Sequence, residues 1–257
     1  AAGALDYATY LGGRAAHPDP HEPDYDFRPS GYDAGVGVVV DGGEAVVFGA
    51  TQSPEFPTTP GAPDRDNLTY CRDRYTVYPC ADAFIARLNA TGSGLVSSTF
   101  LGGDGDDFAR ALALDSAGRA VLAGDTFSAN FPVTPDAYDR AGGLDRDAFV
   151  AVARRDGRLD YATYLGGQHA AGDGWYEGDK ALALHVAADG RITVAGETWS
   201  TDFPTTSASY DRTRNGGACE TDWYQEMGEC PDAFLVQFQP GAAPGFGAFR
   251  RPQWRWS

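Results

Sequence analysis

The stretch LDYATYLGG occurs twice in this chain without a single change, at residues 5–13 and again at residues 159–167. A third version, LVSSTFLGG, lies between them at residues 95–103. Such self-similarity is typical of repeat proteins, in which each copy is a small unit that packs on its neighbours. These three stretches set the frame for interpreting the rest of the sequence.

The same elements follow each stretch in the same order. A strand of small residues comes first, then a turn with Asp and Gly, a second strand, a loop with the pattern T-x-S-x-x-F-P-x-T, and a third strand that opens with Asp-Ala-Phe. Short apolar runs bounded by Gly, Pro and Asp predict strands, so each copy supplies four short antiparallel strands. The small-residue strands are expected at 34–40, 109–114 and 181–186, the second strands from 44, 119 and 191, the loops at 51–59, 126–134 and 198–206, and the third strands at 82–88, 147–152 and 232–238.

This order resembles the SBBP-type β-propeller repeat of bacterial and other surface proteins, whose pattern runs YSTYLGG, GDD, a small-residue strand, NAYVTG, T-x-S-x-x-F-P-T and DAFVAKL. The resemblance covers residues 5 to about 238. It implies an all-β fold of propeller-type blades and a surface location, and it brings no catalytic site. We expect one domain at residues 1–243, with repeats at about 5–94, 95–158 and 159–243, followed by a separate tail at 244–257.

The phase of the repeats raises a problem of closure. If a blade runs outward from its small-residue strand, the chain begins with an outermost strand and ends with a third strand that lacks its outer partner. Propellers typically need four or more blades to close, and unpaired strand edges favour pairing with another chain. We therefore hypothesise that residues 5–11 of one copy complete the blade ending at 232–238 of another, giving a ring of two chains or a filament. The alternatives are a fragment of a longer propeller and an irregular packing of three sheets.

Composition narrows the class of protein. The formal net charge is −16, which disfavours binding to nucleic acid and to anionic membranes. No apolar run approaches the roughly 18 residues of a membrane-spanning helix. Charge and hydropathy therefore predict a protein without nucleic-acid partners and without a membrane span; the location at the cell exterior or cell surface is predicted from the resemblance and from the cysteines.

The four cysteines form two local pairs, Cys71 with Cys80 and Cys219 with Cys230. Local pairs in loops predict two disulfides and an oxidising compartment. A four-cysteine zinc site is the alternative, although neither pair has CxxC spacing. Asn67 and Asn89 each begin an N-glycosylation sequon, which fits a secreted chain.

Two acidic stretches are candidate metal sites. The turn Asp104-Gly-Asp106-Asp107 has the oxygen density that calcium prefers, but it lacks the ligand spacing of an EF-hand, and a plain turn is the default interpretation. The segment 17–24 gathers His17, His21 and three acidic residues within a proline-rich loop, for which a solvated acidic loop is the alternative. Two further histidines are His185, in the third small-residue strand, and His169, beside Trp175 and Tyr176; each is explained equally well as a structural residue. No cofactor is expected apart from calcium.

The tail is basic and aromatic on an acidic protein. Trp and Arg dominate the energetics of protein interfaces, so the tail is a candidate docking peptide, with folding onto its own domain as the alternative. Its candidate partner-binding residues are Phe246, Phe249, Arg250, Arg251, Trp254, Arg255 and Trp256.

These observations favour an extracellular structural protein that acts through protein–protein contacts, as a filament or surface-layer subunit that self-associates or binds other surface proteins. A lectin-like module that binds glycans is the alternative. An enzyme is not expected, because the small-residue strands offer mainly Ala, Val, Leu and Gly rather than convergent polar side chains.

Overall fold

A computed structural model of the chain describes residues 4–14, 26–27, 31–66, 69–72, 76–143, 146–167, 178–220 and 227–240. Of residues 26–27, 218–220 and 227–229 only the backbone is described. The described residues form β-strands and no helices, which confirms the all-β prediction. No helix of the described residues is long and apolar enough to cross a membrane.

Two four-stranded antiparallel sheets follow the chain in simple order. The first consists of β2 (Asp33–Asp41), β3 (Glu44–Thr51), β6 (Asp82–Leu88) and β7 (Leu95–Leu101). The second consists of β8 (Asp107–Leu114), β9 (Ala120–Thr126), β10 (Asp147–Ala153) and β11 (Leu159–Leu165). In both, the strand of small residues is one edge and the LDYATYL-type strand is the other.

The third sheet has three strands: β12 (Lys180–Val186), β13 (Ile192–Thr198) and β16 (Asp232–Phe238). Four-stranded sheets are therefore confirmed for two units, whereas the third sheet has three strands among the described residues and lacks the outer strand whose absence the repeat phase predicted. Each LDYATYL-type strand pairs with the third strand of the copy before it, as β7 does with β6 and β11 with β10. No such strand follows β16 among the described residues, so the third sheet has three strands. Residues 4–14, which precede the first sheet, form no strand.

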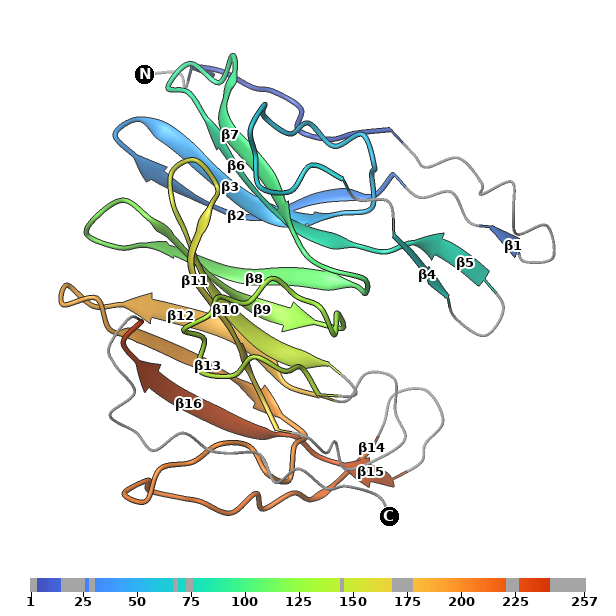
Figure 1. Ribbon diagram of the computed structural model, residues 1–257, viewed down its shortest axis with the longest axis vertical. Helices are drawn as coiled ribbons and strands as arrows, with labels where there is room; N and C mark the ends of the chain where they lie inside the picture. The colour runs from blue at the N-terminus through green and yellow to red at the C-terminus, as the bar shows by residue number, and fades with distance from the viewer. Residues whose placement is uncertain are drawn as a thin grey trace.

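The three sheets lie one on another in an open stack (Figure 1), with the first sheet at one end and the third at the other. One core cluster lies between the first and second sheets and includes Phe48, Ile85, Leu122 and Phe149. Another lies between the second and third sheets and includes Val121, Val150, Ile192 and Val194. Alternating side chains of the second sheet enter one core or the other, because successive residues of a strand point to opposite faces.

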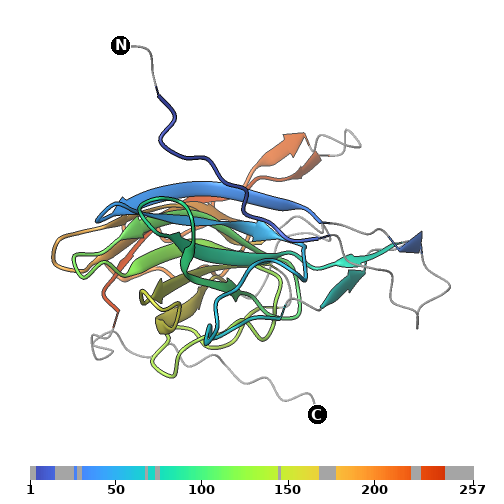
Figure 2. The ribbon, with the colours of Figure 1, turned by 90° about the horizontal axis from the view of Figure 1, so that it is seen from above.

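Both cysteine-containing insertions form small sheets that were not expected. The first pairs β1 (Asp26–Phe27), β5 (Thr76–Pro79) and β4 (Tyr70–Arg72), and the second pairs β14 (Ala218–Glu220) with β15 (Met227–Glu229). Figures 1 and 2 place both beyond the same end of the main strands. The predicted Cys71–Cys80 disulfide is present, with a Cα–Cα distance of 4.9 Å. Cys230 is also disulfide-bonded, whereas the side chain of Cys219 lies outside the described residues.

Candidate assembly surfaces

An aspartate at the start of each sheet is held by the T-x-S loop of its own unit. In the second unit, Asp107 Oδ2 accepts hydrogen bonds from Ser128 Oγ at 2.7 Å and from the Gly103 backbone N–H at 2.8 Å. The Thr126 side chain also binds Asp107, and Ser128 N donates to Thr126 Oγ1 at 2.9 Å. We call this arrangement the Asp–Thr–Ser clamp. It recurs with Gly13, Asp33, Thr51 and Ser53 and with Gly167, Asp179, Thr198 and Ser200.

The clamp explains why T-x-S recurs in the sequence. The T-x-S motif was found in the sequence, but its hydrogen bonds to an aspartate were not predicted. Its threonine and serine lie about twenty residues after its aspartate, so only the fold brings them together. A signal was nevertheless present, since an aspartate stands at or just before each small-residue strand and a T-x-S follows each second strand. The clamp ties the Gly-Gly of every LGG stretch to the sheet that follows it.

At the two interior junctions, the clamp aspartate meets a second buried carboxyl group. A Cβ added at Gly102 would lie 2.3 Å from Asp82 Oδ1 and 2.7 Å from Asp107 Oδ2. At Gly166 the corresponding distances are 2.4 Å to Asp147 Oδ1 and 2.5 Å to Asp179 Oδ2. Each pair therefore joins the Asp-Ala-Phe aspartate of one sheet to the clamp aspartate of the next, with a glycine between them because no side chain fits.

Burial and nearby negative charges raise the pKa of both carboxyl groups in the first pair. Burial, with smaller contributions from the negative charges of Asp107, Asp64 and Asp106, raises the pKa of Asp82 to about 9. Burial also raises the pKa of Asp107 to about 7, against the hydrogen bonds of the clamp. Oδ1 of both side chains is buried without a hydrogen-bond partner. The pair therefore retains a proton at neutral pH.

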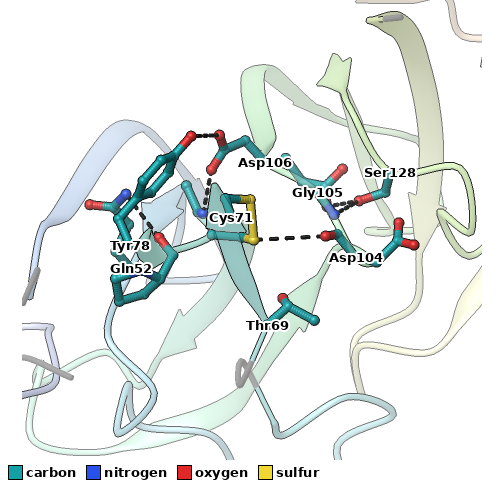
Figure 3. The surroundings of a disulfide bond; sticks show 12 residues. Gln52, Thr69, Cys71, Tyr78, Asp104, Gly105, Asp106 and Ser128 are labelled. Carbon is teal, nitrogen blue, oxygen red and sulfur yellow. Dashed lines mark hydrogen bonds between the residues drawn. A yellow bond between two sulfur atoms is a disulfide. The ribbon is translucent and has the colours of Figure 1, made fainter. Parts of the chain in front are cut away.

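The acidic turn at 104–107 does not gather its carboxylates around one point (Figure 3). Asp106 accepts hydrogen bonds from Ala81 N at 2.7 Å and from Tyr78 Oη at 3.3 Å, while Asp107 belongs to the clamp. The Asp104 side chain is exposed and points away from Asp106. No group of three or more His, Cys, Asp or Glu side chains that could hold a metal occurs in the described residues. The turn instead packs against the disulfide, with Cys80 Sγ lying 3.7 Å from the Asp104 carbonyl oxygen.

The stack ends in a sheet face that nothing among the described residues covers. We call the side that a sheet turns toward the next sheet its front face, and the opposite side its back face. Ile85 and Val150, on the front faces of the first and second sheets, are 8% and 0% exposed, whereas their counterpart Leu235 on the third sheet is 74% exposed. Thr193 and Gln237 lie beside Leu235 and are joined by a hydrogen bond of 2.9 Å. The front face of the third sheet is thus open, with Leu235 as its apolar centre.

The back face of the first sheet is partly open as well. Val38 and Val40 of β2 are 60% and 69% exposed. Their counterparts on β8 and β12 pack against the preceding sheet; they are Leu112, Leu114, Leu184 and Val186. Elsewhere on this back face, Phe84 and Phe100 are covered by Phe56 and Leu11.

Residues 5–11 lie along the margin of the first sheet, with their large side chains largely in solvent. Leu5 is 81% and Tyr10 is 103% exposed. Leu11 packs on the first sheet, and Gly13 is held by the clamp of Asp33. Figure 2 shows the segment leaving the body of the molecule toward the N-terminus. The C-terminal end of the segment is therefore anchored to the first sheet, whereas no part of residues 5–11 forms a strand.

The remaining candidate residues make local contacts, are exposed on the surface, or lie outside the described residues. Asn89 Nδ2 donates to Ser93 Oγ at 3.2 Å within a tight turn, and His185 is exposed on β12. Trp199 lies beneath the ammonium of Lys180 at 4.7 Å, and its counterpart Phe127 lies beneath Arg146 at 4.3 Å. Outside the described residues are Asn67, His17, His21, His169, Trp175, Tyr176 and the whole tail, including Phe246, Phe249, Arg250, Arg251, Trp254, Arg255 and Trp256.

Carboxylates also gather in a cleft between the second and third sheets, lined in part by Asp115, Asp136, Asp160 and Asp189. Arg119 divides this set, because its side chain binds Asp115 at 2.7 Å and Asp160 at 3.1 Å. These ion pairs join the β8–β9 turn to β11 within the second sheet, so Asp115 and Asp160 are not free acid or base groups.

The sequence matches no protein-family model, and no curated protein is significantly similar to it.

Proposed function

We propose that this protein is an extracellular structural module that assembles with further copies of itself through its two end faces. The observation that carries this proposal is the exposure of Leu235, at 74%, where the equivalent Ile85 and Val150 are 8% and 0% exposed beneath a neighbouring sheet. Because the same position packs beneath a neighbouring sheet in the first two units, the open Leu235 offers a further sheet of the same kind an equivalent place to pack.

The two open faces support a head-to-tail mode of contact. Within the stack, every junction joins the front face of one sheet to the back face of the next. The chain leaves one front face open, around Leu235, and one back face, around Val38 and Val40. Two different patches that fit each other make a heterologous interface, which builds rings when the rotation closes and filaments when it does not.

The disulfide and the negative net charge are both compatible with this function. The Cys71–Cys80 disulfide is compatible with an oxidising, extracellular compartment. A net charge of −16 makes copies repel one another in dilute salt and prevents unspecific association. Because salt screens this repulsion, assembly should strengthen as ionic strength rises.

The lectin-like alternative has less support. A sugar-binding surface needs aromatic faces that are free to stack, whereas the rings of Phe127 and Trp199 are used in cation–π contacts with Arg146 and Lys180. The exposed rings of the described part do not occupy equivalent positions in all three units.

The test is the native mass of the purified chain over a range of concentrations, by analytical ultracentrifugation and electron microscopy. We expect oligomers that Leu235→Glu dissociates, and that Val40→Glu also dissociates. Mixing the two variants should give a dimer, because each retains the face that the other has lost. Tyr138→Ser changes a ring that is 56% exposed in a loop of the second unit and serves as the control. A chain that stays monomeric at every concentration and salt level would overturn the proposal.

A further inference from the structure

The stack is open at a strand edge as well as at its faces. Among the described residues, β16 pairs with β13 alone, whereas the equivalent strands β6 and β10 each pair on both sides. Resting on the proposed function, we infer that residues 5–11 of a second copy add to the free edge of β16 as the fourth strand of the third sheet. The chain itself supplies the reason, because residues 5–11 have the same sequence as β11, the strand that completes the second sheet.

The pairing of β11 with β10 fixes the register. Phe149 of β10 lies opposite Tyr164 of β11, and Ala148 lies opposite Leu165. The equivalent antiparallel register sets Phe234 of β16 opposite Tyr10 of the incoming segment. A shift by one residue would turn Tyr10 to the wrong face, so the register is strongly specified.

The surroundings of Tyr164 have a counterpart beside β16. Tyr164 Oη donates to the Ser128 carbonyl oxygen at 2.7 Å and accepts from Phe131 N at 2.8 Å. Phe131 also packs on Phe149, with ring centroids 4.5 Å apart. The third unit has Ser200 and Phe203 at the matching positions, and the Phe203 and Phe234 rings are likewise 4.5 Å apart. The site for Tyr10 is therefore formed before any strand arrives, which lowers the free-energy cost of binding.

The loop after the T-x-S motif offers a further pair of backbone contacts. In the second unit, Thr134 N donates to the Ala162 carbonyl at 3.0 Å, and Ala162 N donates to Thr134 Oγ1 at 3.1 Å. Thr59 and Ser98 make the same two bonds in the first unit. Thr206 of the third unit is exposed and bonds instead with Ser209. Ala8 of the incoming strand has the position of Ala162 and would take up these bonds.

A second copy fits this edge better than the chain's own segment. The clamp holds Gly13 at the first sheet, and β16 lies at the opposite end of the stack (Figure 1). In a head-to-tail contact, by contrast, the back face of the first sheet of one copy meets the third sheet of the other. Its segment 5–11 then lies beside β16, just as β11 lies beside β10 and leads into the third sheet. Face contact and strand addition are thus two parts of one geometry.

The test separates strand addition from face contact. A chain without residues 1–13 and a peptide of residues 5–13 are titrated by calorimetry, with a scrambled peptide as control. We expect the peptide to bind and the deletion to abolish self-assembly. Tyr10→Ala in the peptide should weaken binding by about tenfold or more, as for other interface anchors. Phe203→Ala in the truncated chain should do the same, and a near-ultraviolet dichroism spectrum checks that this variant is folded.

The other outcomes are distinct. If the truncated chain still assembles and the peptide does not bind, the strand inference is wrong while the proposed function stands. If the peptide binds but the full chain never assembles, a second copy is not the occupant of the edge and the proposed function fails as well.

Discussion

Residues 5–11 and β11 (Leu159–Leu165) are the same seven amino acids in two different states. In β11, Tyr164 is 1% exposed within a sheet, whereas Tyr10 is 103% exposed in a segment that is not a strand. Intrinsic β-propensity is identical for the two, so it cannot be the cause of the difference. A neighbouring strand is the cause, in keeping with the strong dependence of β-propensity on context.

The largest expected effect comes from removing the tyrosine ring in each copy separately. Tyr164→Ala should lower the free energy of unfolding by about 3–5 kcal/mol, the usual cost of deleting a buried aromatic side chain. Tyr10→Ala should leave the stability of the monomer unchanged. Urea unfolding at a concentration below assembly measures both, and equal losses would show that residues 5–11 are already packed in the monomer.

A second test uses pH at the junction around Gly102. Because the pKa of Asp82 is raised to about 9, the folded chain keeps a proton that the unfolded chain releases near pH 4. Stability from this group is therefore full at acid pH and falls as pH rises toward 9. Because the folded state binds up to one proton more than the unfolded state, the free energy of unfolding should fall by an amount on the order of 2 kcal/mol between pH 7 and pH 9.

Asp82→Asn is the matched variant for that test, since its amide stays neutral at every pH. Urea midpoints at about pH 7 and about pH 9 should differ for the natural chain and differ much less for the variant. An equally steep fall in both would assign the pH dependence to other groups, among which Asp107, Asp106 and Asp64 face the same carboxyl.

The smallest effect is expected at the glycines. An alanine at Gly166 would place its Cβ 2.4 Å from Asp147 Oδ1 and 2.5 Å from Asp179 Oδ2. Overpacking of this kind costs about 1 kcal/mol when the neighbouring groups can shift. At Gly12 the three nearest atoms all belong to Asp33, the nearest at 2.7 Å, so Gly12→Ala should cost less. Thermal unfolding of the two variants ranks them, and the reverse order would contradict the carboxyl-pair geometry.

Most of the strands could be predicted from the sequence because the repeat fixes their phase. The expected strands at 82–88 and 232–238 coincide with β6 and β16, and the other main strands agree to within a few residues. Residues 5–11 were expected as a strand, and they are not one in the structure, where no described strand lies beside them to pair with. The strands of the cysteine loops were not expected, since β1 pairs in parallel with β5 about fifty residues further along the chain.

The candidate surfaces were predicted only in part. The sequence indicated a free strand and a free edge, and that much rests on repeat phase alone. It did not indicate the clamp, the carboxyl pairs or the open position of Leu235, because these depend on which residues meet across a junction. Asp107 was noticed for its acidic neighbours, whereas its actual partners are Thr126 and Ser128.

The clamp at Gly13 gives the molecule a direction. Since the projecting strand is tied to the first sheet and the vacant edge belongs to the third, the two termini of any open array differ chemically, and each can be blocked separately. A chain without its first thirteen residues could still receive a strand at β16 but would have none to offer. Added in small amounts, it would act as a chain terminator that stops growth at one end and leaves the other end free.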